Sequence, residues 1–411
     1  MSFLVAQLGA RMHYAVPRML HEQGMLEHFY TDICAVKGLP RALKWIPETL
    51  RPAPVKRLLG RVPHGVPKAR ISAFTDFGRE YARRRVHSAS PAHTTAAHLW
   101  AGKTFCERVI ERGLGGATGV YTFNSAGLEL LRYARSCGLH TVTEQTIAPL
   151  QIERALLRAE HARFPAWQAP LPENEVAEEF VEREKAEWQA ANVILCGSEF
   201  VRDGIAQCGG PAKRCVVVPY GVDARFDVPV RPKHASPLRV LTIGEVGLRK
   251  GSPYVFAAAK LLGDRAQFRM VGSVSVQPEV WASLKTPVEL TGPVPRSEIL
   301  AHYAWADVFL LPSLCEGSAT VTYEALACGL PVVTTPNSGS IVREGVDGFV
   351  VPICDPESVA AKLESFLRNP GQLEAFSAAA RIGAQAGTLA AYARRLHAAI
   401  GRFAVNYKEA V

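Results

Sequence analysis

The sequence lacks the usual arrangements of metal-binding side chains. Its nine cysteines form no Cys-x-x-Cys pair, its twelve histidines form no His-x-x-x-His, and there is no Asp-x-Asp to hold a divalent cation on a diphosphate. We therefore expect no metal and no other resident cofactor. The scattered cysteines are typical of reduced thiols, and we expect a cytoplasmic protein.

Long apolar runs are also absent. No stretch approaches the ~18 uninterrupted apolar residues that span a membrane. The opening segment MSFLVAQLGARMH has no basic leader and its apolar run ends at Gly9, so it predicts a buried strand and not a secretion signal. With 411 residues, 48% of them hydrophobic and 21% charged, the chain is long enough for two or three domains.

Positive charge is concentrated in one segment. Between Lys37 and Arg85 there are thirteen Lys and Arg residues against three acidic ones, whereas the net charge of the whole chain is +9. The segment is either a solvated face or a surface that binds an anionic acceptor, nucleic acid or anionic lipid. Binding of anionic lipid would imply a peripheral position at the inner face of the membrane. Nucleic acid is not favoured as the main partner, because the rest of the chain is nearly neutral.

Short apolar segments alternate with helix-like segments along much of the chain. The carboxyl-terminal half shows this most clearly, with the predicted strands LRVLTIG (238–244), QFRMVG (267–272), VELTG (288–292), DVFLLPS (307–313), PVVTT (331–335) and GFVVP (348–352). Continuous apolar strands separated by helices predict parallel sheets covered on both faces. The amino-terminal half repeats the pattern, but its strand signal fades between Phe29 and about Gly113.

The loop-rich, proline-rich segment 218–237 is the predicted domain boundary. We predict an α/β protein with two Rossmann-like, doubly wound parallel-sheet domains that face a central cleft, where ligands of such sheets bind. The predicted parts are an amino-terminal domain (1–218) with a basic insertion at about 37–112, a carboxyl-terminal domain (219–390), and a final helix (391–411) that returns to the amino-terminal domain.

Two glycine-containing segments imitate nucleotide-binding motifs. GLGGATG (113–119) has dinucleotide-type spacing, but it follows a helix and precedes a strand, which is the reverse of the required order. AHLWAGKT (97–104) ends like a P-loop but has Ala97 at the first glycine position and helical surroundings. We interpret both as ordinary structural segments.

The stretch LLPSLCEGSATVTYEALACGLPVVTT (310–335) predicts a ligand site. A strand ends at a proline turn, and Gly317-Ser318 precedes a helix for which Ser318 is the expected N-cap. The helix start and its bare amides favour a phosphate. Glu316 lies before the helix, and Glu324 lies ~9 Å along it, a spacing that suits a sugar at one end of a ligand and a ribose at the other. By itself, such a Glu pair is more often surface charge.

A second stretch, LRVLTIGEVGLRKGSPYVFAA (238–258), places Arg249 and Lys250 after a buried strand. Ser252 is the expected N-cap of the following helix, with Pro253 in the first turn. Two cations at the carboxyl end of a parallel strand can neutralise a leaving diphosphate where other enzymes use a metal. Without further evidence, a Lys/Arg pair in a loop is more often surface charge.

Taken in order, these segments resemble the retaining GT-B-fold glycosyltransferases with a Glu-x7-Glu signature, often called glycosyltransferase group 1 or family 4. The resemblance covers nearly all of the carboxyl-terminal half. Besides the stretches at 244–251 and 310–335, it rests on VVPYGVD (217–223), MVGS (270–273), LTGPVPRSEI (290–299) and GVDGFVVPICDPESVA (345–360).

The resemblance implies a role for each matching residue. Glu324 would hold the donor ribose, and Arg249 and Lys250 would hold the departing diphosphate. Glu316, with the amides of Gly317 and Ser318, would hold the donor sugar. Further donor contacts are implied for Gly272, Gly292 and Val294 in the same domain and for Gly9 and Ala10 in the other. Transfer would be metal-independent and would retain the anomeric configuration.

Three positions depart from the family pattern. Glu245 stands where many members have arginine, and Gly9-Ala10 replaces two glycines. Glu144-Gln145 stands where many members have a histidine near the reacting centre, so either side chain is a candidate for orienting the sugar or acceptor, with Glu144 as a base. Lesser candidates for the cleft, for which packing is an equally good interpretation, are Tyr121, Asn124, Arg11 and His13.

The predicted activity is transfer of a hexose from a UDP-, GDP- or ADP-sugar to a glycan, lipid-linked or small-molecule acceptor, as in polysaccharide biosynthesis. The nucleotide-sugar is a substrate and not a cofactor. Alternatives with the same fold are a nucleotide-sugar epimerase and a phosphorylase. A non-enzymatic alternative is a polyanion or membrane-surface binder built on the basic segment.

Overall fold

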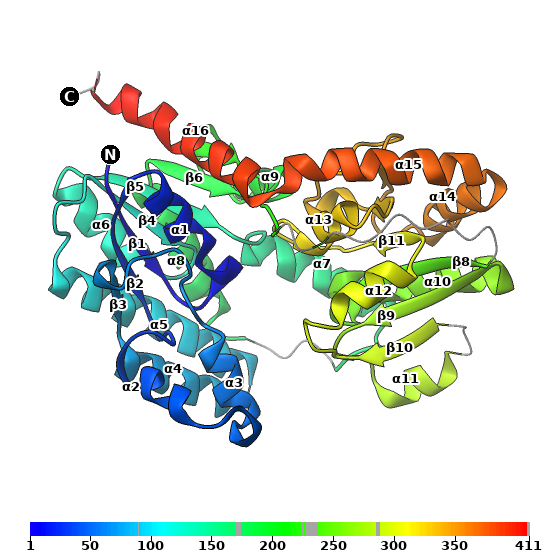
Figure 1. The fold of residues 1–411 in the computed structure, drawn as a ribbon, viewed down its shortest axis with the longest axis horizontal. Coiled ribbons are helices and arrows are strands. Elements are labelled where there is room, and N and C mark those ends of the chain that lie inside the picture. The colour runs from blue at the N-terminus through cyan, green and yellow to red at the C-terminus, as the bar shows by residue number, and fades with distance from the viewer. Residues whose placement is uncertain (89, 170–173, 224–225, 227–236, 285–287, 409–411) are drawn as a thin grey trace.

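A computed structural model describes residues 1–408 of the chain except 89, 170–173, 224–225, 227–236 and 285–287. It has two α/β domains side by side, each built around one sheet (Figure 1). Every pairing between the named strands is parallel. The prediction of two Rossmann-like domains is therefore confirmed.

The amino-terminal sheet has seven strands. All residues of its central strands are buried, as expected for a parallel sheet with helices on both faces. In spatial order the strands are β3 (Ile71–Ala73), β2 (Leu26–Thr31), β1 (Phe3–Gln7), β4 (Gly119–Phe123), β5 (His140–Gln145), β6 (Val193–Cys196) and β7 (Cys215–Val217).

The sequence pattern did not identify β2 and β3. β2 has the mixed sequence LEHFYT with two half-buried positions, and β3 has only three residues at the sheet edge. Both lie where the strand signal fades, because a short or partly exposed strand does not produce a continuous apolar run.

The helices of the amino-terminal domain include those of the basic segment, which form the lower part of this domain in Figure 1. Residues 97–104 lie within a long helix that ends at Arg112, and β4 begins at Gly119. The two imitation motifs are therefore a helix interior and a helix-to-strand turn, as predicted. The helices are α1 (Ala15–Glu22), α2 (Gly38–Ala42), α3 (Ala53–Leu59), α4 (Thr75–Val86), α5 (Pro91–Arg112), α6 (Leu128–Ser136), α7 (Leu150–Arg163), α8 (Ala177–Ala190) and α9 (Glu199–Gln207).

The carboxyl-terminal sheet has six strands, and all of them match apolar segments identified in the sequence. In spatial order they are β10 (Val288–Gly292), β9 (Ala266–Val271), β8 (Leu238–Ile243), β11 (Val308–Leu311), β12 (Val332–Thr334) and β13 (Gly348–Val350). The helices are α10 (Ser252–Leu262), α11 (Pro278–Ser283), α12 (Ile299–Trp305), α13 (Thr320–Ala327), α14 (Pro356–Arg368) and α15 (Pro370–Gly383).

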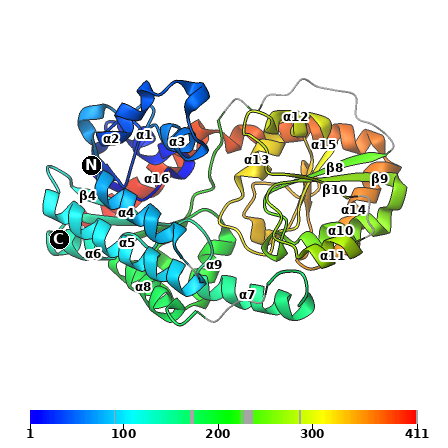
Figure 2. The same cartoon turned by 90° about the horizontal axis from the view of Figure 1, so that it is seen from below.

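Two segments cross between the domains and hold them together. The last helix, α16 (Leu389–Lys408), leaves the carboxyl-terminal domain, and its Tyr392 and Leu396 join the apolar core that surrounds β1 (Figure 1). In the opposite direction, α7 extends from the amino-terminal domain to the carboxyl-terminal domain (Figures 1 and 2), and Trp167 after it packs on Phe256 in the carboxyl-terminal core. Each core therefore includes residues from the other half of the chain.

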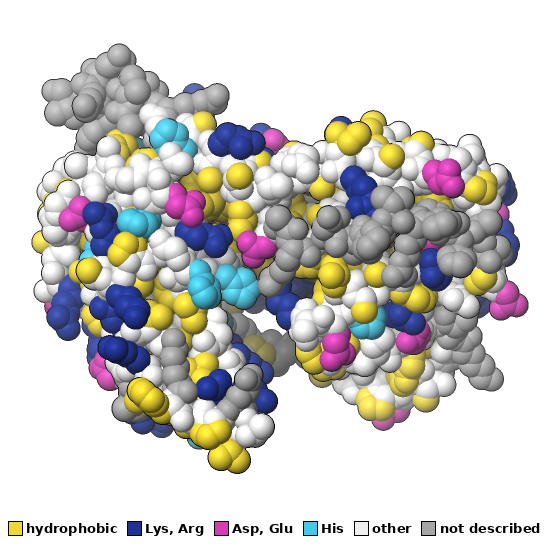
Figure 3. Space-filling model, in the orientation of Figure 1, with side chains coloured by type: hydrophobic (Ala, Val, Ile, Leu, Met, Phe, Trp, Pro, Cys, Tyr) yellow, Lys and Arg dark blue, Asp and Glu magenta, His cyan; other side chains and the backbone are white. Residues whose placement is uncertain are grey.

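None of the helices described in the structure is long and apolar enough to cross a membrane. The surface is hollowed between the lower part of the amino-terminal domain and the carboxyl-terminal domain (Figure 3). The loop after β11 meets the loop after β5, where Gly317 abuts the Thr146 carbonyl, so the carboxyl ends of strands from both sheets face each other.

Candidate active site

Glu316, Arg249 and Lys250 form one charged cluster in the carboxyl-terminal domain. Oε1 of Glu316 lies 3.1 Å from Nη1 of Arg249 and 2.6 Å from Nζ of Lys250. The hydroxyl of Ser313 donates a further hydrogen bond of 3.3 Å to the same oxygen. Glu316 is only 9% exposed, so the interpretation of these residues as unrelated surface charges is wrong.

The loops that carry this cluster are packed tightly on each other. Arg249 and Lys250 lie in a short 3-10 helix after β8, and Glu316 follows β11, the neighbouring strand. Gly251 has a φ of +68°, and a Cβ atom there would lie 2.0 Å from the carbonyl oxygen of Pro312. Only glycine permits this approach, which brings the two cations to the carboxylate.

Glu324 is buried in α13, at 5% exposure, so it is not a surface charge either. Its Oε2 accepts a hydrogen bond of 2.9 Å from the Tyr303 hydroxyl, and its Oε1 lies 3.4 Å from Nη2 of the half-exposed Arg296. Sequence reasoning missed Tyr303 and Arg296, although Arg296 lies within a segment that carried the family resemblance. The Glu324 carboxylate can accept hydrogen bonds from a pair of ligand hydroxyls if the half-exposed Arg296 side chain moves away.

The two predicted N-caps are wrong. α13 begins at Thr320 after Ala319, without a side-chain cap, because the Ser318 hydroxyl bonds to the Tyr323 hydroxyl (2.6 Å) and to the Gly339 carbonyl (3.1 Å). Ser252 is the first residue of α10 and accepts a hydrogen bond from the Gly247 amide. In both places the serine fixes a neighbouring loop instead of the helix end.

Three glycines close the carboxyl ends of β8, β9 and β10. A Cβ atom on Gly272 would lie 1.9 Å from the Gly244 carbonyl oxygen, and the Gly272 amide donates to the Gly292 carbonyl at 3.1 Å. Val294 packs at the edge of the apolar cluster that contains Tyr303. The residues predicted to meet the base, Gly292 and Val294, thus lie on the same side of the domain as Glu324.

On the amino-terminal side, the loop after β1 has unusual backbone angles. Gly9 has a φ of +75° and its amide donates to Oδ1 of Asp32 at 3.0 Å. After Ala10 and Arg11 come three residues with positive φ, Met12, His13 and Tyr14, so the first α-helix starts only at Ala15. Such backbone conformations cost free energy and gather at ligand sites.

Glu144 and Gln145 point into the interior of the amino-terminal domain. Glu144, 2% exposed, accepts hydrogen bonds from the hydroxyls of Tyr121 and Tyr220, and burial raises the pKa of its carboxyl. Gln145 donates to Glu184 and accepts from the indole of Trp188. These contacts tie β5 to the linker and to α8, and neither side chain is part of the mechanism proposed below.

Glu153 of α7 was not identified from the sequence. It faces Arg249 and Lys250 across a cavity of about 480 Å³ that Gln168 also lines. Burial raises the pKa of Glu153; the charge of Glu316 adds to this rise and that of Arg249 opposes it. No local signal marks Glu153, because its position depends on how α7 reaches the other domain. Within the described residues, no three His, Cys, Asp or Glu side chains are grouped as metal ligands.

Comparison with solved structures defines the class of the fold. Sucrose-phosphate synthase from Thermosynechococcus elongatus is similar over 100% of both chains, with a TM-score of 0.66 and 15% identity. HepE from Anabaena, solved in complex with UDP-glucose, is similar over 98% of this chain and 100% of its own, with a TM-score of 0.60 and 14% identity. The fold is that of the GT-B glycosyltransferases.

Sequence comparison then identifies the carboxyl-terminal domain. Residues 237–369 match the model of the family Glycosyl transferases group 1. The amylovoran biosynthesis glycosyltransferase AmsK of Erwinia amylovora is 30% identical over 172 residues, which are 38% of this chain and 42% of that protein. The chain spans about half the length of the curated relatives it matches. The carboxyl-terminal domain is a group 1 glycosyltransferase domain, as the resemblance implied.

Proposed function

We propose that the protein transfers a hexose from a nucleotide-sugar to an acceptor hydroxyl, with retention at the anomeric carbon and without a metal ion. The observation that supports this best is the cluster of Glu316, Arg249 and Lys250 at the carboxyl ends of β8 and β11. Fixed cations beside a carboxylate suit a donor whose diphosphate and sugar are adjacent. HepE, a structure with the same fold, binds UDP-glucose, which supports a UDP-, GDP- or ADP-sugar as the donor here.

In this proposal the donor lies along α13. Its ribose hydroxyls bind Glu324 and displace Arg296, which is half-exposed and 3.4 Å away. Its diphosphate binds Arg249 and Lys250 and takes over part of their pairing with Glu316. That carboxylate, with the Gly317 and Ser318 amides, then binds the sugar hydroxyls, and backbone near Gly272, Gly292 and Val294 meets the base.

The transfer step uses these groups to stabilise the departing diphosphate. The bond between the anomeric carbon and the diphosphate oxygen breaks, and its electron pair stays on the diphosphate. The acceptor oxygen bonds to the same face of that carbon, and the departing phosphate oxygen takes the acceptor's proton. Arg249 and Lys250 stabilise the charge that develops on the diphosphate, the role a metal ion plays in other transferases.

The acceptor belongs to the amino-terminal side of the cleft in this proposal. The name of AmsK refers to amylovoran biosynthesis, which supports a glycan acceptor, whether free, lipid-linked or small. In the basic segment Lys37–Arg85 and just after it, Trp45, Leu50 and Val86 are 89%, 71% and 81% exposed. Exposed apolar side chains among cations suit an anionic bilayer surface, so the proposal includes a peripheral membrane position.

A donor screen with an acceptor mixture tests the proposal. We expect acceptor-dependent release of one nucleoside diphosphate and a product with the donor's anomeric configuration, measured by mass spectrometry and NMR. Lys250→Ala should slow the release about 100-fold, as removal of a transition-state cation does, whereas Lys260→Ala, on the exposed side of α10, should not. Epimerisation of a donor without acceptor, or no consumption of any donor, would overturn the proposal.

A further inference from the structure

A large cavity lies within the amino-terminal domain, outside the donor site described above. Its volume is about 770 Å³, and its walls come from the loops after β1, β2 and β4 and from α3, α4 and α5. It therefore lies at the carboxyl edge of the amino-terminal sheet, where ligands of such sheets bind.

Arginine dominates the charge of this cavity. Five arginines line it, and Asp32 is the only carboxylate among the lining residues. Asp32 is buried and already accepts hydrogen bonds from the Gly9 amide (3.0 Å) and from Arg61 (3.1 Å), so it neutralises Arg61 alone. The lining arginines are Arg11, Arg57, Arg61, Arg79 and Arg85.

Among the described residues, four of these five guanidinium groups have no ion-pair partner: Arg61 pairs with Asp32, and Arg11 donates to the Thr146 hydroxyl. Arg57, Arg79 and Arg85 come from α3 and α4, and all three are exposed to the cavity or its rim. Burial lowers the pKa of His98, which also lines the cavity, and the charges of Arg85 and Arg11 lower it further. The cavity is thus a region of positive potential that the protein's own carboxylates do not balance.

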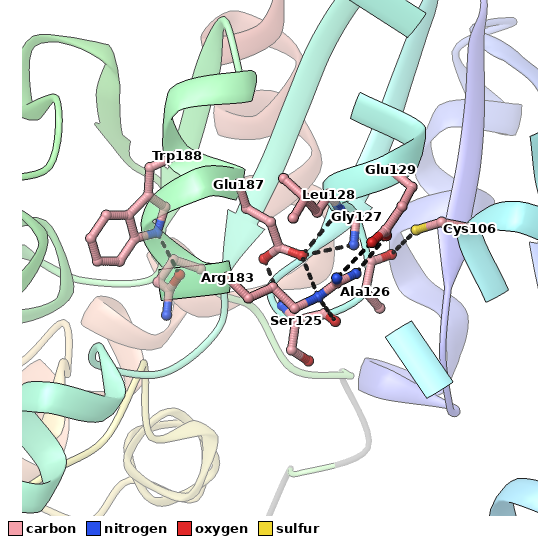
Figure 4. A network of polar contacts seen from close by, with 10 residues as sticks. Cys106, Ser125, Ala126, Gly127, Leu128, Glu129, Arg183, Glu187 and Trp188 are labelled. Atoms are coloured by element: carbon pink, nitrogen blue, oxygen red, sulfur yellow. Dashed lines mark hydrogen bonds and ion pairs between the residues drawn. The ribbon is translucent and has the colours of Figure 1, made fainter. Parts of the chain in front are cut away.

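The floor of the cavity is held rigidly. It includes Ser125, which has a φ of +70°, and Ala126. The buried carboxylate of Glu187 accepts hydrogen bonds from the Ser125 amide (2.7 Å) and the Gly127 amide (2.9 Å), while Arg183 donates to the Ser125 carbonyl at 3.1 Å (Figure 4). A fixed floor is what a specific ligand site requires.

The cavity also adjoins the donor site. Asn124, on its wall, accepts a hydrogen bond of 2.8 Å from the hydroxyl of Thr146, and Arg11 donates to the same hydroxyl. The Thr146 carbonyl in turn abuts Gly317, the residue after Glu316. Thr146 therefore connects the arginine-lined wall of the cavity to the loop that carries Glu316.

We infer that this cavity binds a phosphate or diphosphate group carried by the acceptor. The assignment of this phosphate to the acceptor rests on the proposed function, whereas the anion site itself does not depend on it. Several forked guanidinium groups match the geometry of phosphate oxygens, and their combined charge calls for a group with more than one negative charge. Leu58 and Val86 at the same cavity suit an apolar chain next to that group, so both a lipid-linked diphosphate and a soluble sugar phosphate present the required chemistry.

Pyrophosphate titration by calorimetry tests the site. The titration uses the full chain carrying Arg249→Gln and Lys250→Gln, which removes the proposed diphosphate site of the other domain. The result therefore does not depend on whether the donor site is assigned correctly. We expect binding that Arg57→Gln with Arg79→Gln weakens at least about tenfold, the size expected for charged hydrogen bonds. Lys68→Gln with Arg70→Gln is the matched control: it removes the same charge from the same segment, outside the cavity lining.

One further double variant tests the geometry of the site, and a vesicle assay tests the source of the anion. Arg57→Lys with Arg79→Lys keeps the charge but removes the forked donors, and it should bind pyrophosphate more weakly than wild type. Co-sedimentation with phosphatidylcholine vesicles containing phosphatidic acid identifies the molecule that carries the phosphate. Vesicle binding that is lost in the Arg57/Arg79 double Gln variant indicates a lipid-linked group. Pyrophosphate binding without vesicle binding indicates a soluble one. Equal pyrophosphate affinity in the double Gln variant and its control, or no binding at all, would overturn the inference.

Discussion

Gly317 of the carboxyl-terminal domain abuts Thr146 of the amino-terminal domain so closely that a Cβ atom on Gly317 would lie 1.9 Å from the Thr146 carbonyl oxygen. The Ser198 hydroxyl, also from the amino-terminal domain, donates a hydrogen bond of 2.6 Å to the Gly317 carbonyl. These contacts set the width of the cleft beside Glu316. The domain spacing therefore depends on one glycine in the loop after β11.

Gly317→Ala should uncouple donor binding from transfer. The added methyl group must push the domains apart, and a displacement of ~1 Å at a reacting centre costs about 100-fold in rate. We expect kcat to fall by about that factor while nucleotide affinity, which depends on one domain, changes little. Gly371→Ala is the control, because its nearest atom would lie at an ordinary 3.5 Å. Unchanged kcat in Gly317→Ala would contradict this account of the cleft.

The two glutamates should differ in which kinetic constant they affect. Glu324→Ala removes an acceptor of ribose hydroxyls and should raise the donor Kd about tenfold to 100-fold. Glu316→Ala should mainly lower kcat, because in the proposed mechanism its contacts with the sugar hydroxyls strengthen in the transition state. Steady-state kinetics and calorimetry separate these effects, with the exposed Glu279→Ala as control. Full activity in either glutamate variant would refute the site assignment.

Transfer should continue in saturating EDTA. In the proposed mechanism Arg249 and Lys250, which are paired with Glu316, supply the positive charge where the diphosphate departs, so transfer should need no divalent cation. The measurement is the initial rate with and without chelator, with a magnesium-dependent transferase as a positive control for chelation. Activity that disappears in EDTA and returns with magnesium or manganese would mean that the diphosphate site works differently.

Stability should depend on pH through Glu184. This residue of α8 is 2% exposed, and burial raises the pKa of its carboxyl from 4.5 to about 7. Between these values the unfolded chain releases a proton that the folded chain keeps, so the free energy of unfolding falls as the pH rises, by on the order of 3 kcal/mol. Glu184→Gln lacks this titration.

Urea unfolding at pH 5 and pH 8 tests that linkage. We expect the free energy of unfolding of Glu184→Gln, minus that of wild type, to be larger at pH 8 than at pH 5. Glu179→Gln, on the exposed face of the same helix, should follow wild type at both pH values. A difference between wild type and Glu184→Gln that is the same at both pH values would show that Glu184 does not titrate in this range.

The sequence predicted best what local patterns encode. β8 and β11 are mostly apolar, buried strands, and Arg249, Lys250 and Glu316 lie in the loops that follow them, so their meeting at one sheet edge could be anticipated. Ser318 shows the opposite case. It fits the local rule for an N-cap, but Tyr323 and Gly339 compete for its hydroxyl.

Residues placed by distant segments could not be predicted. Glu144 ends a strand as a cleft residue should, but Tyr220 from the domain linker covers it. Glu153 lines one cavity with Arg249 and Lys250 only because α7 extends to the other domain. The arginine-lined cavity combines α3 and α4 with three strand ends, and β3 beside them has too few residues to give a sequence signal.

A thermal-shift screen of UDP-, GDP- and ADP-sugars against wild type and Glu324→Ala tests the proposed donor site most directly. A ligand at ~100 times its Kd adds about 2.7 kcal/mol to stability, which gives a clear rise in Tm. We expect one nucleotide class to raise the Tm of wild type and to raise that of Glu324→Ala much less. No shift with any nucleotide-sugar, or equal shifts in the two proteins, would contradict a donor site built on Glu324.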